Sequence, residues 1–393
     1  MASTPSPSAS GATVPSEWSL LLAALALPSS KDKSDRIDVE VQSAPPWARV
    51  LDLADRHGVG PLLYQAISGS KDRVPPAVMR ALSERYQVNL HKSLFLAREL
   101  IRILEQLRRF GIETLPYKGI TLGEVVYGDI ALRQAGDIDL LIRPVDLAGI
   151  KAAVLDLGYT SHIELSPAEE RAYLRAGYEC AFDSPAGRNL LEVQWAIQPR
   201  FYAVDLEMEE LFRRSVTVTV AGHTMQTLSR EDQILVLSVH AAKHVWGRMI
   251  WLCDIARIMG SNGLRWDWIQ EQANTLGIAR ILRVTLLVVN QLLGSPIAAS
   301  LKANVLADRE ALAIASEVRS QILRDEACSV ESADYFRLMM RLRERRADRM
   351  RFLWRLVLTP GPNEWRAVRL PAPLFPLYRL VRLSRLVARL GRA

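Results

Sequence analysis

Apolar residues recur at helical spacing over the first part of the chain, which predicts an N-terminal helical region over residues 18–110. Helices are expected at three places: Glu17 to Pro28, Pro46 to Ile67 with a break at Gly58, and Pro75 to Phe110 as one or two long helices. Ser30 to Ala44 is dense in charge and is interpreted as a connector. Residues 1–17 are rich in Ser, Pro and Ala, a composition typical of disordered segments.

Alternating apolar and polar positions replace this spacing between residues 111 and 228. Strands are expected at Gly136 to Ile142, Tyr159 to Leu165, Tyr178 to Phe182, Asn189 to Ile197, and in a hairpin of Val216 to Val220 with His223 to Leu228. Helices are expected at Pro144 to Leu157 and Pro167 to Ala176. The pattern predicts a mixed sheet with helices on one side, which is an α+β core.

Helical spacing returns after residue 228 and predicts a helical domain over residues 229–334. Gln233 to Met259 is expected to form one buried helix, because apolar residues occupy most of its circumference. Further helices are expected at Trp266 to Leu293, Asp308 to Leu323, Leu338 to Leu358 and Leu377 to Leu390. The last two belong to an Arg-rich C-terminal tail, residues 335–393.

Two carboxylates, Asp137 and Asp139, stand one residue apart at the head of an apolar strand. Side chains alternate along a strand, so both carboxylates project to one face about 6.5–7 Å apart. Like charges this close repel unless a cation lies between them, and oxygen ligands of this kind suit Mg²⁺ or Mn²⁺. By itself the pattern also fits two solvated carboxylates, a nucleotide-sugar glycosyltransferase or a haloacid-dehalogenase-type phosphatase.

A short extended run before this strand ends in Lys118-Gly119, at the start of a helical segment. Backbone N–H groups at such a turn bind phosphates, and Lys118 adds a positive charge. Arg133, four residues before Asp137, is a further candidate phosphate ligand.

The motif from Lys118 to Arg143, which includes KG, VVYGD and LRQAGDIDLLI, resembles the uncharacterised bacterial nucleotidyltransferase family of the DNA-polymerase-beta-like superfamily. The resemblance implies a polymerase-beta-like core over residues 111–228 and a third acidic residue on a later strand, for which Glu192 is the match. Asp137, Asp139 and Glu192 are then the expected metal ligands and catalytic residues. Two departures stand out: Lys118-Gly119 replaces the usual Gly-Ser, and Gln194 stands where the family has a His.

A cluster of His240, His244, Arg248 and Asp254 is the second candidate for chemistry. On one helix these residues share or border a single face. Three interpretations stay open: a zinc site, a structural hydrogen-bond cluster, or a wall of the substrate pocket. The zinc interpretation is the weakest, because Ala241 replaces the Glu of H-E-x-x-H and no third ligand is evident.

Apolar content of 49% and charged content of 24% are those of a soluble protein, and three isolated cysteines give no disulfide framework. No apolar run approaches the roughly 20 residues that span a bilayer. A cytoplasmic location is therefore expected.

The net charge of +7 is concentrated in the tail, since residues 341–393 carry fourteen Arg against three acidic residues. The last expected helix places Arg379, Arg382, Arg385 and Arg389 on one side. It fits a membrane-surface helix, an RNA-binding face or a helix packed on the body, and the first two imply an anionic partner.

Together these observations lead us to expect a Mg²⁺-dependent (or Mn²⁺-dependent) enzyme that moves NMP from an NTP, with ATP the expected nucleotide, to a hydroxyl acceptor and releases pyrophosphate. The acceptor stays open among small molecules, peptides or proteins, and RNA. The alternatives are a catalytically degenerate nucleotide-binding or regulatory protein and, ranked lower, a nucleotide-sugar glycosyltransferase.

Overall fold

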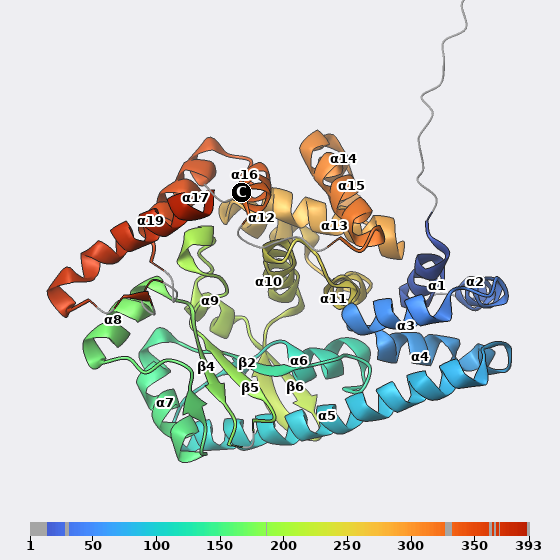
Figure 1. Ribbon diagram of the computed structural model, residues 1–393, viewed down its shortest axis with the longest axis horizontal. Coiled ribbons are helices and arrows are strands. Elements are labelled where there is room, and N and C mark those ends of the chain that lie inside the picture. The colour runs from blue at the N-terminus through green and yellow to red at the C-terminus, as the bar shows by residue number, and fades with distance from the viewer. Residues whose placement is uncertain are drawn as a thin grey trace, which may run out of the picture.

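The computed structural model describes residues 14–390 except 28–30, 186, 327–331, 361–363, 365–366 and 369. Within these residues the chain is a mostly helical α+β protein with a five-stranded mixed sheet (Figure 1). Most of the segment expected to be disordered lies outside the described residues, but Ser16 and Glu17 already belong to the first helix. No described helix combines the length and apolar content needed to cross a membrane.

The helices before the sheet are α1 (Ser16–Leu25), α2 (Lys31–Gln42), α3 (Trp47–Arg56), α4 (Gly60–Ile67), the 3₁₀ helix η1 (Ser68–Arg73) and α5 (Pro76–Arg109). The interpretation of Ser30 to Ala44 as a connector is wrong, because most of it forms α2. Ile37 and Val41, four residues apart and less than 5% exposed, anchor this helix in the core.

The sheet consists of β1 (Leu115–Pro116), β2 (Asp137–Leu141), β3 (Thr160–Ser161), β4 (Glu179–Asp183) and β5 (Leu190–Gln194). Its strand order is β1-β2-β5-β4-β3, and the central β2–β5 pair is parallel while the other pairs are antiparallel. The mixed sheet is therefore confirmed. The strand expected from Tyr159 to Leu165 shortens to the two residues of β3.

Short elements surround the sheet: α6 (Gly119–Leu122), the π-helix η2 (Gly123–Tyr127), the 3₁₀ helices η3 (Pro144–Asp146) and η4 (Arg200–Tyr202), α7 (Leu147–Asp156), α8 (Pro167–Ala176), α9 (Met208–Arg213) and the hairpin strands β6 (Val216–Val220) and β7 (His223–Thr227). Helix α8 has its expected bounds, because Ser166 and Glu169 cap it reciprocally.

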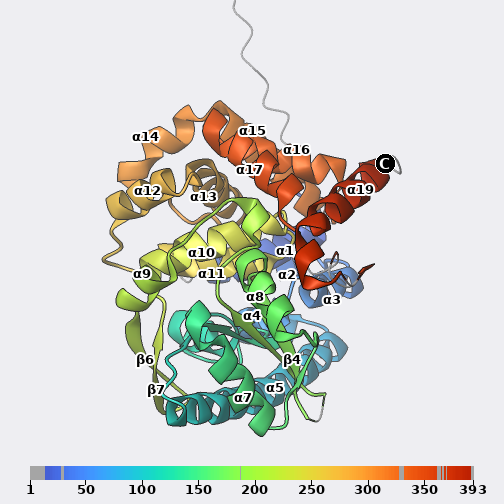
Figure 2. The same cartoon turned by 90° about the vertical axis from the view of Figure 1, so that its left-hand side faces the viewer.

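The C-terminal helices are α10 (Arg230–Lys243), α11 (Met249–Met259), α12 (Trp266–Thr275), α13 (Ala279–Leu293), α14 (Ala299–Ala307), α15 (Arg309–Leu323), α16 (Ala333–Arg341), α17 (Arg346–Leu358), the 3₁₀ helix η5 (Ala372–Leu377) and α19 (Tyr378–Leu390). These helices lie on the side of the sheet away from α5, as two perpendicular views show (Figures 1 and 2). The expectation of a single Arg-rich helix from Leu338 to Leu358 is wrong, since residues 342–345 separate α16 from α17.

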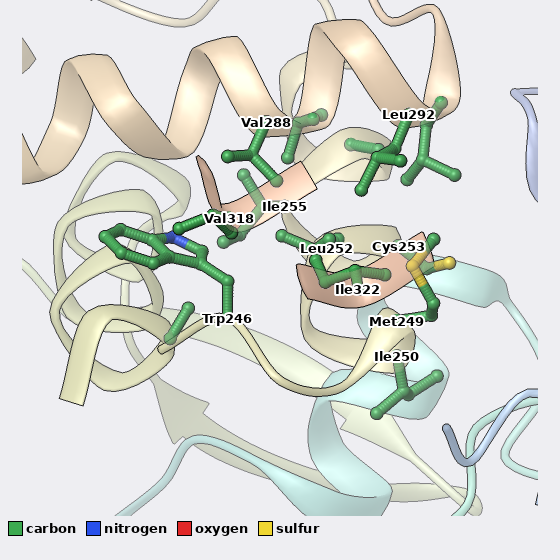
Figure 3. Packing of buried hydrophobic residues seen from close by; sticks show 14 of the residues in the cluster. Trp246, Met249, Ile250, Leu252, Cys253, Ile255, Val288, Leu292, Val318 and Ile322 are labelled. Atoms are coloured by element: carbon green, nitrogen blue, oxygen red, sulfur yellow. The ribbon is translucent and has the colours of Figure 1, made fainter. Parts of the chain in front are cut away.

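The expectation of one helix from Gln233 to Met259 is also wrong, because the chain breaks between α10 and α11. Val245 and Trp246 adopt left-handed backbone conformations, with φ of 52° and 51°. The break inserts the Trp246 indole into the helical core beside Val318 (Figure 3), where its Nε1 donates to Thr285 Oγ1 at 2.9 Å. His57 contacts the start of α11: its Nδ1 accepts a hydrogen bond from the Met249 N–H at 3.3 Å.

Two large cores form around these elements. One joins α1–α4 to α10–α17, and the other lies between the sheet, α7 and the second half of α5. Helix α5 contributes Val78 and Leu82 to the first core and Leu96 through Leu107 to the second. This 34-residue helix therefore fixes the sheet relative to the helical part.

The C-terminal helix α19 packs on α17, in keeping with the third interpretation of the tail. Arg382 Nε donates to the Leu356 carbonyl at 2.6 Å, and its guanidinium forms an ion pair with the buried Glu364 at 3.4 Å. Arg385 lies 3.6 Å from the same carboxylate, whereas Arg379 is exposed. The Arg389 side chain lies outside the described residues.

Candidate active site

Strand β2 carries the two aspartates on the edge of a cavity of about 400 Å³. Asp137 opens the strand and is half-buried, whereas Asp139 is 5% exposed. Ile138 and Leu140 point into the sheet core and fix the strand. The alternation that the sequence predicts is therefore present, and both carboxylates line the cavity.

The neighbouring strand β5 brings Glu192 to the same place. In the parallel β2–β5 register, Asp139 lies directly opposite Glu192. The Gln194 Nε2 atom donates to Asp139 Oδ1 at 3.3 Å and to Glu192 Oε2 at 3.0 Å, so a single amide nitrogen bridges the two carboxylates. The structure thus unites the three acidic residues that the sequence singled out, from segments more than fifty residues apart.

Two residues that the sequence interpretation did not assign to the site complete this face. Gln194 is 3% exposed, and its Oε1 accepts from the Tyr117 hydroxyl at 2.6 Å, which orients its amide toward the carboxylates. Glu179 on β4 lies 3.4 Å from the same amide nitrogen. Strand alternation would have found Glu179, because it stands opposite Gln194 and two residues from Ala181, the partner of Glu192.

Burial and mutual repulsion perturb the carboxylates. Burial raises the pKa of Glu192 to about 8, and Asp139, Glu179 and Asp137 add to the effect through like-charge repulsion. Burial, followed by the charge of Asp139, also raises the pKa of Asp137, and burial raises that of Glu179. The cluster therefore has more negative charge than its protein surroundings stabilise.

Lys118 supplies one positive charge to this cluster. Its Nζ lies 3.0 Å from Asp139 Oδ1, and Asp139 raises the pKa of this lysine although burial opposes it. The next residue must be glycine: Gly119 has φ of 54°, and a Cβ there would lie 3.1 Å from the Asp137 carbonyl oxygen. The Lys118–Gly119 turn is thus packed directly against the head of β2.

Arg133 and Asp254 form a buried ion pair behind the cavity. The Arg133 Nε and Nη2 atoms lie 3.1 Å and 3.0 Å from Asp254, whose carboxylate also accepts from the Tyr127 hydroxyl at 2.8 Å. Arg133 lines the cavity, but its charge is matched by Asp254, which does not line it. The pair ties the loop before β2 to α11, and Arg133 Nη1 lies 3.4 Å from the Gly119 carbonyl.

The ends of α10 and α11 form the opposite wall of the cavity. The rings of His240, His244 and Trp251 lie with centroids 4.9–5.2 Å apart, and Arg248 lies near Trp251. Burial lowers the pKa of His244 to about 4 and that of His240 well below its ordinary value. Both imidazoles are therefore neutral at pH 7.

Lys243 is a further wall residue that the sequence interpretation did not single out. Its Nζ lies 3.3 Å from the Tyr178 hydroxyl, and both side chains line the cavity beside Glu179. Its only sequence signal is its position between His240 and His244 on α10.

The acidic face has the donor chemistry of a hard divalent cation. Asp137, Asp139 and Glu192 offer carboxylate oxygens from adjacent strands. A cation would offset the cost of burying the Glu192 charge and would relieve the like-charge repulsion that adds to it in raising the Glu192 pKa. Across the described chain, no three His, Cys, Asp or Glu side chains already form a metal-binding group. The residues fit such an ion, with Lys118 now partly neutralising Asp139.

Acidic residues on adjacent strands, a lysine beside them and a polar cavity are the features of a site for metal-assisted transfer of a phosphoryl or nucleotidyl group. The chain belongs to the uncharacterised nucleotidyltransferase family, whose model matches residues 43–294. Membership identifies the protein as a nucleotidyltransferase enzyme and implies an NTP substrate. Enzymes of this kind typically use a divalent metal ion. No curated protein and no solved structure matches the chain.

Proposed function

We propose that the protein transfers NMP from an NTP, with ATP the expected nucleotide, to a hydroxyl acceptor and releases pyrophosphate. The observation that carries this proposal is the parallel register of β2 and β5, which sets Glu192 opposite Asp139 in the cavity that Lys118 also lines. Residues 111–228 are the proposed polymerase-beta-like core, and residues 18–110 and 229–334 are the flanking helical regions. Their shared hydrophobic core supports one helical body beside the catalytic sheet.

Asp137, Asp139 and Glu192 hold Mg²⁺ or Mn²⁺ in this proposal. When bound, the ion supplies charge stabilisation for the triphosphate and activation of the attacking hydroxyl. Lys118, released from Asp139 toward the phosphates, and the Gly119 backbone neutralise charge on the leaving group. Arg133 acts through its ion pair with Asp254, holding the Lys118–Gly119 turn in place.

The reaction balances without a redox partner. The acceptor oxygen forms a bond to the α-phosphorus, the bond from that phosphorus to the α–β bridging oxygen breaks, and pyrophosphate leaves. The hydroxyl proton passes to a carboxylate of the cluster, for which Glu192 is our candidate. His240, His244 and Arg248 form the pocket wall. The neutral imidazoles of His240 and His244 suit contact with an organic substrate.

A degenerate nucleotide-binding protein is the second candidate. The ion pair of Lys118 with Asp139 favours it, because that pair already neutralises part of the acidic face. A glycosyltransferase is disfavoured: between residues 14 and 136, the part of the chain that the structure describes contains helices and the two-residue β1, not a Rossmann-like half.

The test incubates the protein with each of the four α-³²P-labelled NTPs and cell extract, with Mg²⁺ or with EDTA. We expect Mg²⁺-dependent label in an acceptor, equimolar pyrophosphate and no label with Asp137→Asn. Nucleotide binding without pyrophosphate release would favour the degenerate binder instead.

A further inference from the structure

A second cavity of about 510 Å³ adjoins the proposed catalytic cavity. The two cavities share Gln134–Gly136, Arg248 and Ile250 as lining residues. Gly136 directly precedes Asp137, so a molecule in the second cavity borders the head of β2 from the side of α5. Both volumes are within the range that small-molecule sites occupy, so the pair can hold two substrates at once.

The charged residues that line the second cavity are mainly cations. Arg85, Lys92 and Arg248 line it against a single acidic residue, Glu84. Asp55 neutralises Arg85 at 3.0 Å, whereas Lys92 and Arg248 form no ion pair with any described residue. These two charges are notable because the chain outside the tail has a net negative charge.

The proposed NTP does not require these two charges together. Lys118 and the acidic face of the first cavity already provide for a triphosphate and its metal ion, and Lys92 lines only the second cavity. Val88, which is 70% exposed, and Ile250 add apolar surface to the same cavity. The lining thus suits an organic molecule with an anionic group.

We propose that this second cavity binds the acceptor, and that the acceptor is a small molecule carrying a phosphate or carboxylate group besides its reactive hydroxyl. Lys92 and Arg248 bind the anionic group, and the hydroxyl reaches the α-phosphate past Gly136. This inference rests on the proposed function and deepens it by naming the acceptor class.

Val88 offers a substitution that isolates charge from shape. Its exposure makes Val88→Glu and Val88→Lys compatible with folding, and the two variants are similar in size but opposite in sign. An anionic ligand a few ångströms away should bind roughly tenfold more weakly to Val88→Glu than to Val88→Lys. Lys92→Gln should also weaken binding, with Lys302→Gln, an exposed lysine on α14, as the matched control.

The binding experiment titrates inorganic phosphate and, separately, acetate into the metal-free full-length variants by calorimetry. We expect the order of affinity to be Val88→Lys, wild type, Val88→Glu, with the better-bound anion indicating phosphate or carboxylate. Equal affinity of the two Val88 variants for both anions would overturn the proposal. Because no transfer occurs in this measurement, failure of the proposed function does not affect it.

The transfer experiment separates small molecules of a cell extract on an anion-exchange column and supplies each fraction with α-³²P-labelled ATP and Mg²⁺. Labelled product should form with the retained, anionic fraction, more slowly for Val88→Glu than for Val88→Lys. Labelling from the unretained fraction would show that the acceptor is not anionic and would overturn the proposal. A difference in the Kd of ATP between the two Val88 variants would also overturn it, because the second cavity would then bind the nucleotide. Absence of label from every fraction would refute the proposed function, and the calorimetry would still decide the anion site.

Discussion

Replacing Glu192 with Gln should make the metal-free protein more stable while removing its activity. Gln has nearly the same shape as Glu, so the change removes charge and leaves packing intact. The folded protein holds the Glu192 pKa at about 8 through burial and three neighbouring carboxylates, compared with 4.5 for an ordinary glutamate. A raised folded-state pKa favours folding below the ordinary pKa, and this contribution is lost as pH rises from about 4.5 to about 8.

The expected gain at pH 8 follows from that shift. Because Glu192 is partly exposed and interacts strongly with Asp139, we discount the full shift to about 1–3 kcal/mol of unfolding free energy. For a chain of this length that corresponds to a Tm rise of roughly 1–4 °C. Near pH 4 the variant and the wild type should have equal stability.

The assay is thermal unfolding at pH 4, 6 and 8 in EDTA, repeated with Mg²⁺. Mg²⁺ should stabilise the wild type and narrow the difference, because the ion binds the folded carboxylates. Glu105→Gln, which removes an exposed charge on α5, is the control. NMP transfer by Glu192→Gln should fall by at least ~10²-fold. A Glu192→Gln protein less stable than wild type at pH 8 in EDTA would refute this electrostatic reasoning.

Three further predictions follow from individual contacts. Gly119→Ala should lower both stability and transfer rate, the rate by about 10-fold or more, because the new Cβ displaces the Asp137 carbonyl. Gly128→Ala is the control: Gly128 has a similar positive φ but open space around it, so this variant should lose only about 1 kcal/mol of unfolding free energy in urea. Burial lowers the His57 pKa to about 4, so the neutral imidazole favours folding above pH 6.5, and this contribution of roughly 2–3 kcal/mol is lost as pH falls toward 4. The stability advantage of wild type over His57→Gln should therefore shrink between pH 6.5 and pH 4. A difference in unfolding free energy that stays constant over this range would contradict the prediction. Deletion of residues 377–393 should lower Tm by several degrees, because it removes the Arg382 contacts with α17 and Glu364. An unchanged Tm with weaker RNA or liposome binding would instead favour an RNA-binding face or a membrane-surface helix.

The acidic face could be predicted because its signals are local. Asp137 and Asp139 stand at the head of an apolar strand, and alternation alone places both on one face. The pairing of Glu192 with Asp139 required the resemblance to a family, since no local rule sets the register of parallel strands so distant in sequence.

The break between α10 and α11 could not be predicted in the same way. The apolar pattern from Gln233 to Met259 is continuous, and no proline interrupts it. The chain leaves the helix because Trp246 gains a buried site with a partner in Thr285 and because His57, from α3, receives the N–H of Met249. These are tertiary contacts that override local helix propensity.

Other differences had signals that the interpretation did not use. Ile37 and Val41 have the spacing of a helix face, although the charge of their segment suggested a connector. Gln194 was interpreted as the loss of a histidine, but the structure shows that its amide joins Asp139, Glu192 and Glu179. An amide can donate to several carboxylates without titrating, which an imidazole cannot do.

The most direct test of the proposed transfer compares α-³²P-labelled and γ-³²P-labelled ATP in single-turnover reactions with Mg²⁺ and an anionic extract fraction. Nucleotidyl transfer predicts that the α-label enters the acceptor and the γ-label leaves in pyrophosphate, and that Asp139→Asn abolishes both. A γ-label in the acceptor, or α-label transfer that Asp139→Asn does not reduce, would contradict the assignment of Asp137, Asp139 and Glu192 as a nucleotidyltransferase site.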